Sequence, residues 1–281
     1  MRANKVPLPL RMVRWIFPKL EWVSSRLAVR YFEKIFFTPL QYRTPFKERE
    51  FESNAHFFDI DWKRRIQGYE WGDSSKPYVL VIHGWAGRAT QFRKFIPALL
   101  DHGYRVIGFD GPAHGRSEGK RTNLYEFEEV LRKIVEMKGA PEAILAHSFG
   151  GGVALYAIMK GLPVRKLINI ASPTIADEIV KSYLNAIGGS WKTGAAFKRL
   201  IHQKYGKPFE EFTSMHFIKE ITDLNLLLVH DADDKDVSIV QAEELIIAYP
   251  KGRLLTTHGL GHNRVLKDDK VISACLDFMR D

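Results

Sequence analysis

The chain has 281 residues, of which 45% are hydrophobic, so it is long enough for one large or two small globular domains. Its single cysteine, Cys275, cannot form a disulfide within the chain, and no group of Cys and His has the spacing of a zinc site. The net charge is +9, but the basic surplus lies before residue 44 and not in a catalytic region, which argues against a nucleic-acid substrate.

Residues 1–45 are predicted to form a basic arm that precedes the catalytic domain. The segment has nine basic and two acidic residues: Arg2, Lys5, Arg11, Arg14, Lys19, Arg26, Arg30, Lys34 and Arg43, with Glu21 and Glu33. An apolar stripe recurs at three- and four-residue steps: Leu20, Val23, Leu27, Tyr31 and Ile35. This spacing predicts one amphipathic helix between Lys19 and Phe37, opened by Pro18 and closed by Pro39.

Two hypotheses for this amphipathic arm remain open. The apolar stripe is expected to pack on the catalytic core, which is the commoner fate of such a helix. Alternatively, the arm lies on an anionic membrane surface, because five aromatic residues accompany the excess positive charge: Trp15, Phe17, Trp22, Phe36 and Phe37. No apolar run has the length of a membrane span or a secretory signal, so we expect a cytoplasmic protein, peripheral on the inner membrane surface under the second hypothesis.

Residues 46–281 are predicted to form the catalytic domain, in which short apolar runs alternate with helical stretches from residue 78 onward. Six strands are predicted: Tyr78–Ile82, Arg105–Phe109, Ala143–Ala146, Lys166–Ile170, Asn225–Val229 and Arg253–Thr256. Helices are predicted at Thr90–Leu100, Leu124–Met137, Gly151–Met159, Ile239–Ala248 and Asn263–Met279, and an antiparallel edge pair at Ala55–Ile60 and Arg65–Trp71. The fold class is therefore α/β, with a mostly parallel central sheet covered by helices on both faces.

One connection, at about residues 173–223, is too long for a plain crossover between strands. Glycines separate helical pieces rich in Trp, Phe and Tyr, and this apolar content argues against disorder. We therefore predict a helical lid inserted into the domain.

Ser148 stands where an apolar strand runs into a helix of small residues. Such a turn forces the serine into a strained backbone conformation and needs small neighbours, here Ala146 and Gly150. The helix N-terminus also directs free N–H groups at the site, which favours negative charge on an attacked carbonyl oxygen. A serine that merely caps a helix is the alternative, so the motif alone does not establish a nucleophile.

The segment around Ser148 resembles the Gly-x-Ser-x-Gly nucleophile elbow of the α/β-hydrolase superfamily, with Ala146 in place of the first Gly. The resemblance runs from Tyr78 to the C-terminus and implies the α/β-hydrolase fold. The segment His-Gly-Trp85-Ala-Gly resembles that family's oxyanion loop. This match implies that the backbone N–H groups of Trp85 and Phe149 hold the oxyanion.

A further loop, Asp110-Gly-Pro-Ala-His-Gly-Arg-Ser117, is similar to the family's Asp-x-x-Gly-His-Gly-x-Ser loop, with Ala113 where Gly is usual. Its counterpart in the family is mainly structural. Without the resemblance, His114 and Ser117 could be paired as base and nucleophile, but they lie three residues apart on a loop that has no elbow.

A nucleophilic serine needs a base, and the base needs an orienting carboxylate. Four aspartates follow one predicted strand within a single turn: Asp231, Asp233, Asp234 and Asp236. The family pattern His-Gly-x-x-Asp-x-x-Val-Pro, aligned on His230 and Val237, implies that Asp234 is the acid, with Asp233 as the main competitor.

The base must follow the acid, because the chain order in this family is Ser, acid, His. Only His258 and His262 satisfy this order, and both lie in the loop after the last predicted strand. The family's Gly-x-Gly-His pattern implies His262 and leaves His258 as the competitor.

These motifs together predict a serine hydrolase of the carboxylesterase or lipase kind, which cleaves an ester or thioester through an acyl-enzyme on Ser148. The expected partner is a small-molecule ester or thioester, and no cofactor, metal or nucleic acid is implied. An acyltransferase that uses the same acyl-enzyme is one alternative. A non-catalytic binding protein of the same fold, in which the basic arm is the functional part, is the other.

Overall fold

The computed structural model describes residues 8–280, and these divide into two compact units. Unit 1 consists of Met1–Thr38 and Ile175–Thr213, and unit 2 of Pro39–Thr174 and Ser214–Asp281. Arg2 and Lys5 of the predicted basic arm lie outside the described residues. No helix of residues 8–280 is long and apolar enough to span a lipid bilayer.

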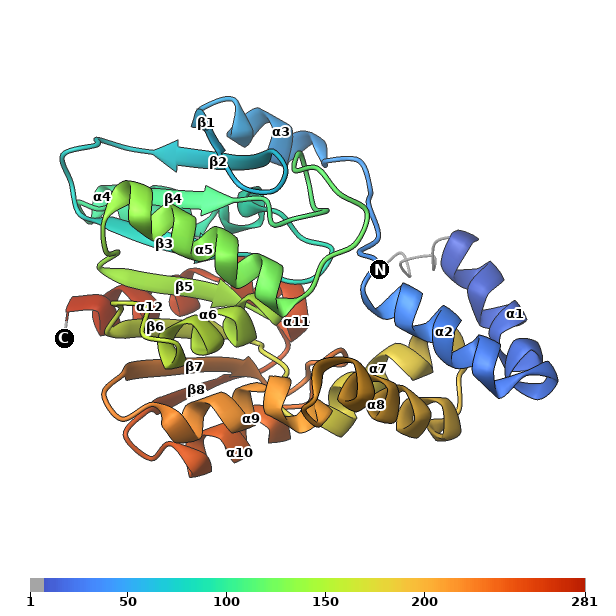
Figure 1. The fold of residues 1–281 in the computed structure, drawn as a ribbon. Coiled ribbons are helices and arrows are strands. Elements are labelled where there is room, and N and C mark those ends of the chain that lie inside the picture. The colour runs from blue at the N-terminus through green and yellow to red at the C-terminus, as the bar shows by residue number, and fades with distance from the viewer. Residues whose placement is uncertain (1–7, 281) are drawn as a thin grey trace. The chain divides into compact units, whose positions relative to one another are not determined.

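Unit 2 is built on one sheet, which contains eight strands among the described residues, in the order β1-β2-β4-β3-β5-β6-β7-β8 (Figure 1). The strands are β1 His56–Ile60, β2 Ile66–Trp71, β3 Tyr78–Ile82, β4 Arg105–Phe109, β5 Ala143–His147, β6 Lys166–Ile170, β7 Asn225–Asp231 and β8 Arg253–Thr257. Strand β2 pairs antiparallel with β1 and β4, and every other pairing is parallel. The predicted mostly parallel sheet, with an antiparallel pair at one edge, is confirmed.

The strands are apolar on both faces because helices cover both sides of the sheet (Figure 1). In β3, Leu80 and Ile82 point into one layer, and Val79 and Val81 point into the other. Helices α5, α6 and α10 contribute to the first layer, and α4 and α12 to the second. The helical elements of unit 2 are α3 Phe46–Glu52, η1 Ala89–Phe92, α4 Phe95–Asp101, α5 Leu124–Lys138, α6 Phe149–Met159, α9 Ser214–Phe217, η3 Ile218–Glu220, α10 Val240–Ala248, α11 Gly261–Arg264, η4 Val265–Lys267 and α12 Asp269–Arg280.

Unit 1 combines the N-terminal arm with helices from the long insertion. Its helices are α1 Leu8–Val23, α2 Ser25–Phe36, α7 Ala176–Ile187, α8 Trp191–Tyr205 and the short η2 Phe209–Phe212. Their buried side chains form one apolar cluster, which includes Phe17 and Phe32 of the arm and Phe197 and Phe209 of the insertion. The rings of Phe32 and Phe197 lie edge to face with centroids 5.0 Å apart. The arm therefore packs on the insertion helices, whereas the sequence led us to expect the catalytic core as its partner.

The arm forms two helices where the sequence predicts one that begins at Pro18. Pro18 lies inside α1, and the break comes at Ser24, whose hydroxyl accepts the N–H of Leu27 at 3.4 Å and caps α2. This break shifts the helical phase, so that Val23 and Leu27 of the predicted apolar stripe are exposed. The prediction of a continuous stripe is wrong for these two residues.

Candidate active site

Ser148 occupies the turn between β5 and α6. Its backbone angles, φ 53° and ψ −124°, lie in a region that residues with a Cβ rarely adopt. Hydrogen bonds hold this conformation, since the Ser148 N–H donates to the Ile170 carbonyl at 2.8 Å and the Ser148 carbonyl accepts from the Ser172 hydroxyl at 2.8 Å. The strained turn that the sequence predicts is present.

Glycines allow the loop after β3 to approach this turn closely. A Cβ on Gly150 would lie 2.4 Å from the Ile82 carbonyl oxygen, and a Cβ on Gly84 would lie 2.8 Å from the Cβ of Ser148. The next residue, Trp85, packs its ring edge to face against Phe149, with centroids 5.2 Å apart. The structure thus brings together the two residues whose N–H groups the resemblance implies as oxyanion donors. Phe149 begins α6, where N–H groups have no partner within the helix.

Ser148, His262 and Asp234 form one hydrogen-bonded chain. His262 Nε2 lies 3.1 Å from Ser148 Oγ, and His262 Nδ1 lies 2.8 Å from Asp234 Oδ2. An ionised carboxylate only accepts hydrogen bonds, so Nδ1 carries the proton in the neutral ring and Nε2 is left as an acceptor for the serine hydroxyl. Ser148 comes from the β5–α6 turn, His262 from the one-turn helix α11 after β8, and Asp234 from the loop after β7.

Asp234 is buried and remains the ionised member of this chain. Its Oδ1 accepts the backbone N–H groups of Asp236 at 2.8 Å and Val237 at 3.0 Å. Burial raises the pKa of Asp234, but the hydrogen bonds from His262 and these N–H groups outweigh it, so the pKa lies below its ordinary value.

Asp233 and His258, the alternatives for the acid and the base, do not join this hydrogen-bonded chain. Asp233 is exposed and accepts the Gly259 N–H at 2.8 Å, while His258 is exposed. Neither takes part in the hydrogen-bonded chain among the described residues. Asp234 and His262, the residues that the resemblance implies, are the ones that belong to this hydrogen-bonded chain.

Asp231 is a buried residue whose contribution the sequence did not reveal. Its Oδ2 accepts the Thr257 hydroxyl at 2.8 Å and the Leu260 N–H at 3.0 Å, so it ties the end of β7 to the loop that carries His262. Burial raises the pKa of Asp231, but hydrogen bonds from Gly261, Thr257 and Leu260 lower it below the ordinary value. The family pattern has Gly at position 231. The Asp that replaces it was the one sign in the sequence that this position has an additional structural role.

His114 and Ser117 do not contact each other as base and nucleophile. His114 Nε2 accepts the Ala86 N–H at 3.0 Å, next to Trp85, and its Nδ1 donates to the Pro112 carbonyl at 2.9 Å. Burial lowers the pKa of His114 to about 4, which keeps the ring neutral. Ser117 Oγ donates to the Asp110 carbonyl and accepts the Gln67 N–H. Both residues serve to hold loops in place.

His147, the residue before Ser148, supports the histidine loop. Its Nε2 donates to the carbonyl of His262 at 2.9 Å, and the two rings have centroids 4.8 Å apart. Burial lowers the pKa of His147 to about 3, so this ring is neutral and adds no positive charge beside His262.

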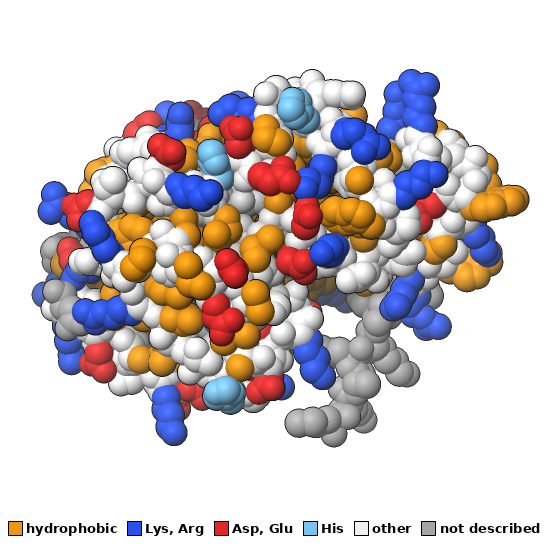
Figure 2. All heavy atoms as spheres, turned by 90° about the horizontal axis from the view of Figure 1, so that it is seen from below, with side chains coloured by type: hydrophobic (Ala, Val, Ile, Leu, Met, Phe, Trp, Pro, Cys, Tyr) orange, Lys and Arg blue, Asp and Glu red, His pale blue; other side chains and the backbone are white. Residues whose placement is uncertain are grey.

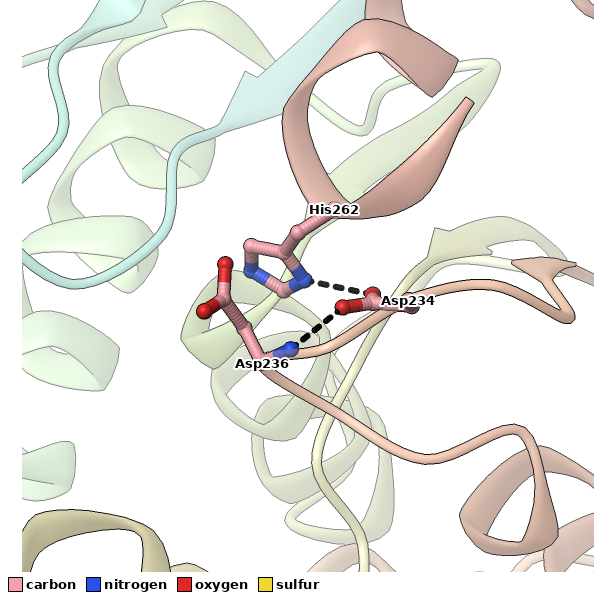
Figure 3. Close-up of side chains that lie close together, drawn as sticks. All are labelled: Asp234, Asp236 and His262. Atoms are coloured by element: carbon pink, nitrogen blue, oxygen red, sulfur yellow. Dashed lines mark hydrogen bonds and ion pairs between the residues drawn. The ribbon is translucent and has the colours of Figure 1, made fainter. Parts of the chain in front are cut away.

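Asp236 is an exposed carboxylate close to this chain of residues (Figure 3). The close-up shows Asp234 and Asp236 on opposite sides of the His262 ring. Asp234, Asp236 and His262 are the group of described residues whose ligand atoms, all within 4.8 Å of one another, could hold a metal ion. However, both Asp234 oxygens and His262 Nδ1 are already engaged with one another or with backbone N–H groups, so this donor set is poorly suited to a metal.

Comparison with known proteins identifies the fold as that of the α/β-hydrolases. A family model described as "alpha/beta hydrolase fold" matches residues 77–198. The esterase of Pyrococcus furiosus has a similar structure, with a TM-score of 0.64, 18% sequence identity and coverage of 86% of this chain and 96% of that one. Identity at this level supports the fold alone.

Curated relatives match shorter stretches of sequence. The magnesium-chelatase 30 kDa subunit of Rhodobacter capsulatus is 31% identical over 117 residues, which cover 38% of this chain and 40% of that protein. A serine hydrolase-like protein of Homo sapiens is 36% identical over 93 residues, which cover 31% of this chain and 45% of that protein. The chain therefore spans less than half the length of these relatives.

Proposed function

Because the chain belongs to the α/β-hydrolase fold family, we propose that it is a serine hydrolase that cleaves a carboxylic ester or thioester. The observation that carries this proposal is the hydrogen-bonded chain from Ser148 Oγ through His262 to Asp234, with distances of 3.1 and 2.8 Å. A nucleophile, a base and an orienting acid in this arrangement are what acyl transfer requires.

In the first half-reaction, Ser148 Oγ attacks the substrate carbonyl carbon while His262 Nε2 takes the hydroxyl proton. The N–H groups of Trp85 and Phe149 stabilise the oxyanion of the tetrahedral intermediate. His262 then gives its proton to the leaving oxygen or sulfur as the bond to the carbonyl carbon breaks. The products of this step are an acyl-enzyme on Ser148 and a free alcohol or thiol.

In the second half-reaction, water attacks the acyl carbon while His262 Nε2 takes a proton from it. The tetrahedral intermediate collapses, the bond to Ser148 Oγ breaks and His262 returns the proton to the serine. Asp234 accepts the Nδ1 hydrogen bond throughout and stabilises the imidazolium ring that forms in both steps.

The test is labelling by a fluorophosphonate probe, which reacts with activated serines. We expect the purified protein to be labelled on one residue, and Ser148→Ala to abolish the labelling. Ser75→Ala, which changes an exposed serine in the loop before β3, is the matched control and should label at the normal rate. Labelling of Ser148→Ala at an undiminished rate would show that another serine is the nucleophile.

Turnover then separates the two catalytic hypotheses. A panel of acyl esters and thioesters of increasing chain length should release free acid if water is the acceptor. Formation of a new ester or amide, only when an alcohol or an amine is added as the acceptor, would identify an acyltransferase. No labelling of the folded protein would favour the binding-protein hypothesis.

A further inference from the structure

Helix α1 has a second apolar face that is exposed. The first face carries Phe17 into the unit 1 core. The second face is formed by residues spaced three, four or seven apart that are each at least 42% exposed: Met12, Trp15, Ile16, Trp22 and Val23. Trp15 and Trp22 are 67% and 89% exposed, and Leu27 of α2 is 53% exposed. Two tryptophans on one exposed helix face form a concentrated apolar surface.

Basic side chains without ion-pair partners lie on the same two helices as this face. Among residues 8–280, no carboxylate forms an ion pair with the basic residues of α1 and α2: Arg11, Arg14, Lys19, Arg26, Arg30 and Lys34. The two acidic residues of these helices have other partners, since Glu21 accepts the Ser190 hydroxyl at 3.0 Å and Glu33 pairs with Lys204 at 2.8 Å. The positive charge beside the exposed apolar face is therefore not neutralised locally.

The charge asymmetry extends to the whole of unit 1. Its two segments carry fourteen basic and six acidic residues, which accounts for +8 of the net charge of +9. On the face of the molecule drawn in Figure 2, both basic (blue) and hydrophobic (orange) side chains are visible on the surface of unit 1. Unit 2, which carries the proposed triad, is nearly neutral.

We propose that the exposed face of α1 docks unit 1 on an anionic lipid surface. Tryptophan is suited to the boundary between headgroups and acyl chains because its ring is largely apolar and its N–H can still reach water or headgroups. Arginine and lysine beside an apolar stripe are attracted to anionic headgroups at the same depth. A second copy of the chain fits less well, because it would bring another unit with eight excess positive charges to the same face.

The docking face is already folded before it meets a membrane. Phe17 and Phe32 anchor α1 and α2 in the unit 1 core, and the Ser190 N–H bonds to Glu21 link α1 to the start of α8. Binding therefore does not require a disordered segment to fold, and docking carries no entropic cost of folding this segment.

The experiment is vesicle flotation of the full chain with phosphatidylcholine alone and with phosphatidylcholine containing phosphatidylglycerol. We expect flotation with the anionic vesicles only, and release by salt that screens the attraction. Brominated lipids should quench part of the tryptophan fluorescence when the protein is bound. This assay does not depend on catalysis, so Ser148→Ala should bind as well as the natural chain even if the proposed function fails.

Two pairs of variants test the residues of the face. Trp15→Gln with Trp22→Gln should reduce binding on the order of tenfold per residue, because the apolar area that enters the interface is lost. Arg14→Gln with Lys19→Gln should reduce it about fivefold per charge. The matched controls on unit 2 are Met137→Gln with Ile247→Gln, both exposed, and Lys94→Gln with Lys160→Gln. These controls should bind normally.

Three results would overturn the proposal. The first is a full chain that stays at the bottom of the gradient with both kinds of vesicle. The second is equal loss of binding in the α1 variants and their unit 2 controls, which would indicate attraction to overall charge. The third is a dimer in sedimentation that Trp15→Gln with Trp22→Gln dissociates, which would identify a second copy as the occupant of the face. The changed residues are exposed, so the melting temperature should stay unchanged and exclude unfolding as the cause.

Discussion

At the scale of single residues, Asp234 uses its two carboxylate oxygens for different purposes. Oδ2 holds His262, and Oδ1 is fixed by two backbone N–H groups of its own loop. An amide at this position would place an NH₂ group against one of these donors, so the loss of charge would come with a loss of orientation.

We therefore expect Asp234→Asn to lower kcat about 10⁴-fold, and His262→Ala to have an effect of at least that order. The matched controls are their exposed neighbours, Asp233→Asn and His258→Ala, which should keep most of the turnover. Steady-state kinetics on any ester that the protein hydrolyses measures these effects. If a control lost more activity than its partner, the catalytic role would move to that neighbour.

Asp231 should affect stability in a way that depends on pH. Because its folded pKa is lowered, the ionised group stabilises the fold at all pH values above the ordinary carboxyl range, and this contribution is lost as the pH falls below about 4. Asp231→Asn should reduce the free energy of unfolding at pH 7 by about 2 kcal/mol, since its hydrogen bonds to a charged group are lost.

Denaturant unfolding at a series of pH values tests this expectation. The free energy of unfolding should fall less steeply between about pH 5 and pH 2 in Asp231→Asn than in the natural chain. Asp233→Asn is the control in the same loop and should leave the slope nearly unchanged. Parallel slopes for Asp231→Asn and the natural chain would contradict the assigned ionisation.

At the scale of elements, the packing of α6 against β3 positions Ser148. The close approach requires a glycine at position 150. A Cβ there would meet backbone atoms of β3 and of the following loop, and these backbone atoms cannot move aside as a flexible side chain could. Gly152, two residues later in the same helix, has only the Ser214 Oγ near its Cβ position, at 3.6 Å. The two glycines therefore differ in the space around them and not in their secondary structure.

Gly150→Ala is expected to lower the free energy of unfolding by about 2–4 kcal/mol and to slow probe labelling of Ser148, because α6 must shift away from β3. Gly152→Ala should be neutral or stabilising by up to about 1 kcal/mol, because alanine favours helix and the site has room. Thermal melting and labelling rates report both effects. Equal destabilisation by the two substitutions would contradict the packing argument.

At the scale of the whole molecule, the chain separates charge from the proposed chemistry. The residues proposed for catalysis lie in unit 2, and almost all the net charge lies in unit 1. Unit 1 is assembled from two segments far apart in the sequence, and its core needs both of them. The arm is therefore a structural part of unit 1. Without the arm, the apolar side chains of the insertion helices would be exposed to solvent.

Phe32→Ala should accordingly loosen α7 and α8, although it lies more than 140 residues before them. The loss of a buried phenylalanine costs about 3–5 kcal/mol, which is enough to open unit 1 locally. Hydrogen exchange should show faster exchange in α7 and α8 and unchanged protection in β3 and β5. Phe46→Ala, an exposed control that is 71% accessible, should change neither region. Unchanged protection of α7 and α8 in Phe32→Ala would show that the arm and the insertion are independent.

The sequence alone was sufficient to predict the sheet and the order of the site residues. Strands such as Tyr78–Ile82 and Lys166–Ile170 are short, apolar on both faces and bounded by turn residues, so local pattern defines them. The loops that carry Ser148, Asp234 and His262 all follow such strands. In contrast, α3 was not predicted, because seven mostly charged residues have no apolar period.

Only the tertiary structure decided how the arm packs and which loop residues meet. The apolar face of α1 is locally compatible with the catalytic core, a membrane or another helix, because hydrophobic burial is not directional and does not specify a partner. The structure assigns Phe17 to the insertion core and leaves Trp22 exposed. Likewise, Asp231 joins two loops that are separated in the sequence, and no spacing rule could have shown that contact. Local periodicity specifies helices and strands, whereas contacts between segments distant in the sequence depend on how the entire chain folds.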